Sequence, residues 1–201
     1  MGNDTIVVGV TGFKRHGKDS VANHLVENYG FVKYSFANPL KDTCAAAFGI
    51  PRADFDDDVK KELPCELYPD WTLRKILQIV GTELFRSIWP NIWIDRFLQS
   101  AGGLRRVVIP DVRFINEEAA TRQFKGFVIR VEDPRKPPNT DLHQSEMEIP
   151  RLNYDHWINN DGTLDDLASR VDYLAKLHGL TQERKRDGAS AFPLSGRLTL
   201  T

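Results

Sequence analysis

A short apolar segment followed by a glycine-bearing loop constrains the fold of this chain more than any other feature. Residues 5–10 (TIVVGV) are β-branched and apolar, which is typical of a strand buried on both faces. The loop GFKRHGK (12–18) follows, and apolar residues then recur at helical spacing from Val21 to Tyr29. This strand–loop–helix order matches G-x-x-x-x-G-K, whose glycines let backbone N–H groups and a helix N-terminus surround phosphate oxygens. The sequence therefore predicts a phosphate-binding loop.

The residue after the loop lysine departs from the usual pattern. Lys18 is expected to reach the β- and γ-phosphates of a nucleotide. A Ser or Thr hydroxyl for Mg²⁺ usually follows it, but here Asp19 and then Ser20 follow, and one residue rotates a helical side chain by about 100°. Asp19 either holds Mg²⁺ through water, accepts a proton from the attacking group, or only complements the helix dipole. The residues expected around the phosphates are Gly12, Lys14, Arg15, His16, Gly17, Lys18, Asp19 and Ser20.

The rest of the chain alternates short apolar strands with amphipathic helices. Further strands are expected at 31–36, 107–109, 127–131 and 154–158, and helices at 39–48, 72–89, 93–100, 115–124 and 163–177, the last capped by Asp161 or Thr163. Residues 51–70 and 133–148 are expected as loops. This alternation predicts an α/β fold, in which a parallel sheet lies between helices in three layers and ligands bind beyond the carboxyl ends of the strands.

Length and composition limit the domain organisation and the partners. With 201 residues, one domain over 1–180 and a tail over 181–201 are expected. Lys and Arg number 27 and Asp and Glu 28, so the net charge of −1 disfavours a nucleic-acid-binding protein. The two cysteines lie in no CxxC or Cys/His cluster, which disfavours a disulfide scaffold or a structural zinc site. No apolar run suits a membrane helix and the N-terminus lacks signal-peptide features, so we expect a cytoplasmic protein.

A polar stripe on one expected helix suits a small anionic ligand. Four residues of the helix at 72–89 are spaced four apart and share a face: Arg74, Gln78, Thr82 and Arg86. The stripe is either a solvated surface or a binding surface, and it lacks the acids that a solvated stripe would mix in. Guanidinium groups suit phosphate, and an amide suits the edge of a base. Trp71 and Trp93 either stack on a base or pack in the core.

Charged residues also follow the later strands. Asp111 comes at the end of the strand at 107–109, where it either acts on Mg²⁺ or caps a turn and pairs with Arg113. The polar loop at 133–148 is either a lid that brings a cation to a transferred phosphoryl group or an exposed connection. Arg130 and Arg135 are both candidates for that cation.

Together these segments resemble the bacteriophage type of deoxynucleoside monophosphate kinase, within the P-loop kinases. The segments that carry the resemblance are GFKRHGKDS (12–20), SFANPLK (35–41), LQIVGTELFR (77–86) with WI (93–94), VIPDVRFINE (108–117), HQSE (143–146) and INNDGTLDDL (158–167). They span almost the whole chain before the tail. GKDS and DVRFINE are the most specific of them.

The resemblance implies a nucleoside monophosphate kinase-like fold and transfer of the ATP γ-phosphoryl group to a deoxynucleoside monophosphate, with Mg²⁺. It also implies a substrate-binding helical part over about 51–100, a homodimer, and, for a phage protein, the host cytoplasm. Asn160 and Gly162 would lie near adenine. The residues implied around the monophosphate are Phe36, Ala37, Lys41, Trp71, Arg74, Gln78, Thr82, Arg86, Trp93, Asp111 and Arg113. Catalytic roles are expected for Lys18, Asp19, Asp111, Arg113 and Arg130, with Asp19 and Asp111 toward the metal.

Two other functions stay open. A P-loop kinase for another small phosphorylated metabolite would share the GKD loop, although SFANPLK and LQIVGTE favour a nucleotide acceptor. A nucleotide-binding switch without catalysis would not need a second anionic pocket. An acceptor panel separates the first two, and ATP binding without acceptor-dependent turnover would indicate the third.

Overall fold

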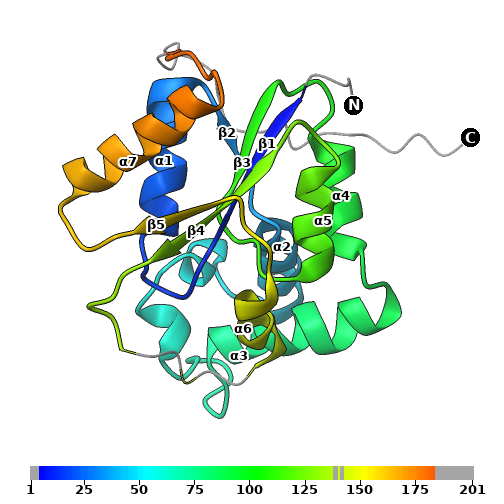
Figure 1. Ribbon diagram of the computed structural model, residues 1–201. Helices are drawn as coiled ribbons and strands as arrows, with labels where there is room; N and C mark the ends of the chain where they lie inside the picture. The colour runs from blue at the N-terminus through cyan, green and yellow to red at the C-terminus, as the bar shows by residue number, and fades with distance from the viewer. Residues whose placement is uncertain (1–4, 138–139, 141–142, 184–201) are drawn as a thin grey trace, which may run out of the picture.

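A five-stranded parallel sheet forms the centre of the computed structural model, which describes residues 5–137, 140 and 143–183 (Figure 1). The strand order is β2-β3-β1-β4-β5. The strands are β1 (Ile6–Thr11), β2 (Val32–Lys33), β3 (Arg106–Ile109), β4 (Phe127–Glu132) and β5 (His156–Asn159). Val8 on β1 lies opposite Val108 on β3 and Phe127 on β4, so these strands end at the same edge. The expected parallel α/β fold is confirmed.

Helices cover both faces of the sheet because successive strand residues point to opposite sides. On one face, α1 (Lys18–Tyr29) and α7 (Leu164–Leu177) pack on a core that includes Val108 (Figure 1). On the other face, α2 (Ala37–Phe48), α4 (Ile92–Ser100) and α5 (Ile115–Arg122) pack on Val107 and Ile109. Thr163 caps α7 by accepting the backbone N–H of Asp166 at 3.2 Å, which settles the choice between Asp161 and Thr163.

Strand β2 is shorter than the expected segment at 31–36, and Asp111 gives the reason. After Tyr34 donates its backbone N–H to Val108 O at 2.9 Å, the chain leaves the sheet. The carboxylate of Asp111 then accepts the backbone N–H groups of Phe36 and Ala37 at 3.1 and 3.0 Å. These bonds satisfy donors at the start of α2, which therefore begins at Ala37 rather than at residue 39.

The expected single α-helix at 72–89 is in fact two consecutive helices of different type. An α-helix, α3 (Leu73–Gln78), continues directly into a π-helix, η3 (Ile79–Arg86). Gly81 lies at the contact with α2, where a Cβ would come within 2.5 Å of Leu40 Cδ2, and its carbonyl accepts the Trp93 indole N–H at 3.2 Å. A step of four residues turns by more than 360° in an α-helix but by less than 360° in a helix with i→i+5 bonds. The rotations of the side-chain direction in α3 and in η3 are therefore opposite, and the polar stripe stays on one side.

Both expected loops contain short helical turns. The segment at 51–70, here called the acidic segment, contains two 3₁₀ turns, η1 (Arg52–Phe55) and η2 (Lys60–Glu62). The segment at 133–148 contains α6 (Gln144–Met147), followed by the 3₁₀ turn η4 (Ile149–Arg151). Of the expected tail, only residues 181–183 belong to the described part of the chain.

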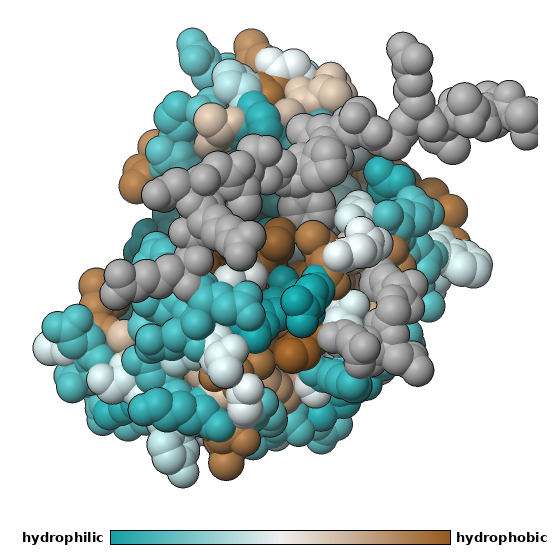
Figure 2. Space-filling model, turned by 90° about the horizontal axis from the view of Figure 1, so that it is seen from above, coloured by the Kyte–Doolittle hydropathy of each residue, from teal (hydrophilic) through white to brown (hydrophobic). Residues whose placement is uncertain are grey.

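No helix in the described residues combines the length and apolar character needed to cross a membrane. Figure 2 shows one face of the molecule, on which hydrophilic residues predominate and apolar residues form separate spots.

The packing of the phosphate loop against β4 makes glycine necessary at position 12. Gly12 has φ +139°, and a Cβ there would lie 2.3 Å from the backbone oxygen of Val131. Gly49 also has a positive φ, +67°, but a Cβ there would meet open space. We therefore expect Gly12→Ala to lower the free energy of unfolding by more than about 3 kcal/mol, and Gly49→Ala by about 1–2 kcal/mol. Urea unfolding measures both values, and equal losses would contradict the tight packing of the loop.

Candidate active site

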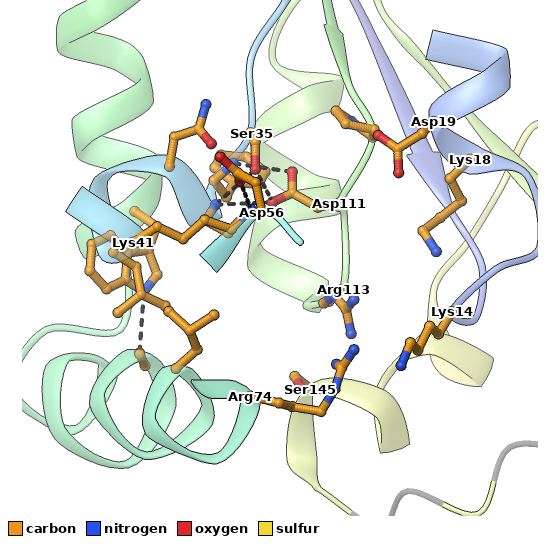
Figure 3. Close-up of a pocket in the computed structure, with 18 of the residues that line it drawn as sticks. Lys14, Lys18, Asp19, Ser35, Lys41, Asp56, Arg74, Asp111, Arg113 and Ser145 are labelled. Atoms are coloured by element: carbon orange, nitrogen blue, oxygen red, sulfur yellow. Dashed lines mark hydrogen bonds and ion pairs between the residues drawn. The ribbon is translucent and has the colours of Figure 1, made fainter. Parts of the chain in front are cut away.

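A cavity of about 920 Å³ opens beyond the carboxyl ends of β1, β2 and β3, where the sheet topology predicts a ligand site (Figure 3). One wall is the phosphate loop with the start of α1. The opposite wall is formed by α2, α3 and η3, and the floor by the segment after β3. Ser145 of α6 also reaches the cavity.

The loop curls because three of its residues adopt positive φ. Gly12, Arg15 and Gly17 have φ values of 139°, 63° and 101°. Lys18, the first residue of α1, folds back over the loop, where its Nζ donates to Phe13 O at 2.6 Å. Burial, together with the positive charge of Arg113, lowers the pKa of Lys18 to about 7. An anion bound beside this group would favour its charged form.

Four cationic side chains from separate elements converge on one space. Lys14 of the loop, Lys18 of α1, Arg74 of α3 and Arg113 after β3 point toward each other across the cavity (Figure 3). Such crowding of like charge is unfavourable unless anions lie among the cations. The arrangement therefore suits one or more phosphate groups.

The acidic segment, expected only as a loop, supplies carboxylates to these cations. Glu62 of η2 places one carboxylate oxygen 2.5 Å from Lys14 Nζ and 2.5 Å from Arg74 Nε. From the same segment, Asp56 pairs at 2.8 Å with Lys41, a further cation that lines the cavity. Glu62 is 39% exposed, so it can leave these cations without leaving a buried charge behind. Its position is one that a phosphate oxygen would take.

The two aspartates expected at the metal differ in their surroundings. Asp19 is 76% exposed at the cavity, and one of its oxygens contacts Lys33 Nζ at 2.6 Å. Asp111 also lines the cavity, but its oxygens accept the hydroxyl of Ser35 at 2.6 Å in addition to the two backbone N–H groups of α2. Asp111 thus caps the start of α2, and no ion pair between Asp111 and Arg113 is seen among the described residues. Arg113 forms an ion pair with Glu146 instead.

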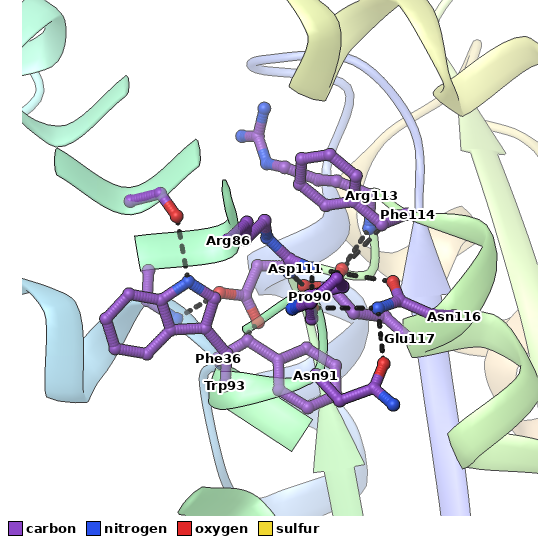
Figure 4. Close-up of polar contacts among 12 residues, drawn as sticks. Phe36, Arg86, Pro90, Asn91, Trp93, Asp111, Arg113, Phe114, Asn116 and Glu117 are labelled. Carbon is purple, nitrogen blue, oxygen red and sulfur yellow. Dashed lines mark hydrogen bonds and ion pairs between the residues drawn. The ribbon is translucent and has the colours of Figure 1, made fainter. Parts of the chain in front are cut away.

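Arg86 is held by a buried glutamate. Its guanidinium forms an ion pair with Glu117, lies 3.9 Å from the ring centroid of Phe114, and donates to Pro90 O at 2.9 Å (Figure 4). The Glu117 side chain is only 3% exposed, and its second oxygen accepts the backbone N–H of Arg113 at 2.8 Å. Burial raises the pKa of Glu117 to about 7 despite the opposing effect of Arg86. Glu117 therefore joins η3 to the segment after β3.

The cavity gathers most of the residues singled out from the sequence. Those that line it are Lys14, Arg15, Gly17, Lys18, Asp19, Ser20, Phe36, Ala37, Lys41, Arg74, Gln78, Thr82, Arg86, Trp93, Asp111 and Arg113. The lining as described does not include Gly12, His16, Trp71, Arg130, Asn160 or Gly162. The sequence reasoning gave no role to Glu62, Glu117 or Glu146, because each acts on a residue distant in the chain or on another element.

His16 and the turn after β5 lie behind the loop. His16 is buried, and its Nδ1 accepts the backbone N–H of Asp133 at 3.0 Å. Asn160 donates its side-chain amide to His16 O at 3.1 Å, while Arg135 donates to the backbone oxygens of Asn160 and Gly162 at 2.9 and 3.3 Å. These contacts support the loop from the side opposite the cavity.

The remaining departures have equally local causes. Arg130 pairs with Glu132 at 2.7 Å and donates to Ile149 O at 3.1 Å, so it faces η4 and not the cavity. Trp71 lies over a separate apolar hollow beside Tyr68. Trp93 is buried and lines the cavity, but its indole N–H already donates to the carbonyl oxygen of Gly81. Neither Arg130 nor Arg135 thus lines the cavity.

Comparisons with known proteins show the family to which this chain is similar. The family model of deoxynucleotide monophosphate kinases matches residues 6–63 and 58–171. A protein of Acanthamoeba polyphaga mimivirus, named as a candidate deoxynucleotide monophosphate kinase, is 32% identical over 182 residues, which cover 83% of this chain and 94% of that protein. The deoxynucleotide monophosphate kinase of Enterobacteria phage T4 is 24% identical over 233 residues, covering 82% and 96%. Among solved structures, shikimate kinase from Aquifex aeolicus matches with a TM-score of 0.49 at 13% identity, covering 86% and 96%.

The lowered pKa of Lys18 predicts that anion binding takes up a proton. With a pKa of about 7, most of Lys18 is neutral at pH 8 in the free protein. A bound polyphosphate favours the ammonium form and raises this pKa again. Binding of tripolyphosphate at pH 8 should therefore take up about one proton, and uptake should decline below pH 6, where Lys18 is already charged.

Calorimetry in buffers of different ionisation enthalpy measures this proton uptake. Lys18→Arg is the control, because its guanidinium stays charged throughout the range. We expect no uptake in this variant. Equal uptake by the variant and the unmodified protein would show that another group titrates.

Proposed function

Since the chain belongs to the deoxynucleotide monophosphate kinase family, we propose that it transfers the γ-phosphoryl group of ATP to a deoxynucleoside monophosphate, which gives a deoxynucleoside diphosphate and ADP. The observation that carries this proposal is a phosphate loop that faces a second cationic wall across one cavity. Two phosphate-bearing substrates can bind there side by side, because the cations of both walls offset the negative charges of their phosphates. The turn at 160–162, behind the loop, is proposed to lie on the adenine side.

The cations of the cavity supply what phosphoryl transfer needs from a protein. Catalysis of this reaction consists mainly of positioning the reactants and stabilising charge on the transferred group. We propose that Lys18 contacts the β- and γ-phosphates and that Lys14 and Arg113 offset charge on the transferred group. The attacking group is a phosphate oxygen, which is already ionised near neutral pH. A general base is therefore not required, and this argues against proton acceptance by Asp19.

The acceptor is proposed to lie along the polar stripe. Arg74 is the guanidinium for its monophosphate, because its partner Glu62 is exposed and displaceable. Arg86 is less suited, since it already offsets the buried carboxylate of Glu117. Gln78 offers an amide to a base edge, with Phe36 and Trp93 as apolar neighbours in the lining. Arg86→Ala would leave Glu117 without its counter-charge and would chiefly test stability.

Mg²⁺ fits this site through one carboxylate. The ion usually takes one or two protein carboxylates and completes its shell with substrate phosphates and water. Asp19 is exposed at the cavity beside Lys18, whereas the oxygens of Asp111 already accept three hydrogen bonds. Within the described residues, no group of three or more His, Cys, Asp or Glu side chains could hold a metal ion. We propose that Asp19 holds Mg²⁺, which when bound would offset phosphate charge.

Domain and assembly follow the same proposal. We propose one kinase domain over residues 1–180, with the part over about 51–100 on the acceptor side, and a homodimer in solution. Sedimentation equilibrium of the full chain tests the dimer, and a monomer at micromolar concentration would contradict it.

An acceptor panel tests the proposed function. ADP release should depend on a deoxynucleoside monophosphate when the four deoxynucleotides, the four ribonucleotides and a sugar phosphate are compared. Lys18→Ala should lower kcat by a factor of about 100 or more, because it removes charge stabilisation of the transferred group. Lys75→Ala changes an exposed lysine of α3 and should leave kcat unaltered. Turnover with the sugar phosphate alone, or ATP binding without acceptor-dependent turnover, would overturn the assignment.

Glu62 generates a separate prediction, because it competes with phosphate for Lys14 and Arg74. Glu62→Gln should lower the KM for the nucleotides roughly two- to fivefold, which corresponds to one or two exposed ion pairs. The difference should shrink at high salt, where exposed charges are screened. Glu66→Gln, an exposed glutamate four residues further on, is the matched control for steady-state kinetics. A rise in KM for Glu62→Gln would show that Glu62 organises the site instead.

A further inference from the structure

A buried carboxylate on α6 lies outside the roles assigned so far. Glu146 is 3% exposed and forms an ion pair with the guanidinium of Arg113. Its other oxygen, Oε2, is buried and has no hydrogen-bond partner among the described residues. Burying a carboxylate is costly unless an opposite charge offsets it. Arg113 is therefore the group that stabilises Glu146 in its ionised form, and the two side chains depend on each other.

Arg113 in turn lies in a crowd of like charges. It lines the cavity with Lys18 and Arg74, and its charge contributes to the lowered pKa of Lys18 (Figure 3). Repulsion from these neighbours would drive a freely rotating guanidinium toward solvent. Two glutamates oppose this movement. Glu117 accepts the backbone N–H of Arg113 at 2.8 Å, and Glu146 holds the side chain.

Glu146 is held differently from Glu62, the exposed carboxylate that pairs with Lys14 and Arg74. Two hydrogen bonds fix the residues directly after α6 to the body of the protein. The backbone N–H of Ile115 donates to Glu148 at 3.3 Å, and Arg130 donates to Ile149 O at 3.1 Å. A phosphate can replace the exposed Glu62, but Glu146 is buried and stays beside Arg113. This assigns Arg130 a part in holding the α6 segment.

We propose that Glu146 is a positioning residue of the phosphoryl transfer: its carboxylate holds the Arg113 guanidinium at the cavity beside Lys18. The proposal rests on the proposed function for its kinetic consequence. Its structural part, the ion pair that restrains Arg113, stands on the contacts alone. Glu146 reaches no reacting atom itself, since Ser145, and not Glu146, is the α6 residue in the cavity lining.

Glu146→Gln separates positioning from charge and from general stability. The amide keeps the size of the side chain but removes a negative charge near the phosphates, so anion affinity should not fall. We expect kcat to drop at least tenfold while the Kd for ATP changes less than threefold. Glu27→Gln, an exposed glutamate of α1, is the matched control and should resemble the unmodified protein in both. A parallel loss of ATP affinity, kcat and melting temperature would indicate a merely structural residue and overturn the proposal.

A double-mutant cycle identifies Arg113 as the group through which Glu146 acts. Arg113→Lys should lower kcat by itself, because a lysine cannot reproduce the planar guanidinium. When Glu146→Gln is added to Arg113→Lys, kcat should fall by less than a further twofold, because the guanidinium that Glu146 holds is already absent. Losses that multiply would show that Glu146 acts on something else, which contradicts the proposal.

Nuclear magnetic resonance tests the pair without any reaction. The ¹⁵N signals of the Arg113 guanidinium are assigned by their disappearance in Arg113→Lys. In the full-length protein they should report a side chain restrained on the nanosecond timescale, and in Glu146→Gln a mobile one. Equal mobility in both would overturn the positioning role. If the restraint is present but no acceptor supports turnover, the proposed function fails and the structural role of Glu146 stands.

Discussion

Repulsion among cations that share one cavity is the constraint on which this site depends. Four separate elements each contribute one cation to the cavity: Lys14 from the loop, Lys18 from α1, Arg74 from α3 and Arg113 from the segment after β3. The charges stay together because carboxylates from other segments lie among them. Burial, together with the neighbouring charge of Arg113, lowers the pKa of Lys18, and the gathered cations suit the polyphosphate ligand that we propose.

The carboxylates divide into two kinds by burial. Glu117 and Glu146 are each 3% exposed and hold Arg86 and Arg113, so breaking either ion pair would leave a buried carboxylate without its counter-charge. Glu62 is 39% exposed and bridges two cations from opposite sides of the cavity. Exposed pairs are weak and screened by salt, whereas a buried pair is costly to break. This difference in burial is the basis for proposing that substrate phosphates replace Glu62 while the two buried pairs stay intact.

Local patterns in the sequence were sufficient for the sheet, the phosphate loop and the polar stripe. The strand at 5–10 and the loop at 12–18 are contiguous, so their periodicity and glycines can be recognised without a fold. The carboxylates that pair with the cations cannot be recognised from the sequence in this way, because Glu62 lies 48 residues from Lys14 and Glu117 lies 31 residues from Arg86. The short β2 likewise follows from a tertiary contact, at Asp111, and the sequence pattern does not distinguish the π-helical η3 from an α-helix.

In the proposed arrangement, both substrates bind in one cavity with their phosphates between the loop and α3. Calorimetric titration with adenosine joined to a deoxynucleoside through a polyphosphate bridge tests this claim most directly. We expect one molecule to bind per chain, more tightly than ATP, and to be displaced by ATP and by a deoxynucleoside monophosphate alike. Binding no tighter than ATP, with displacement by ATP alone, would place the acceptor elsewhere and contradict the account.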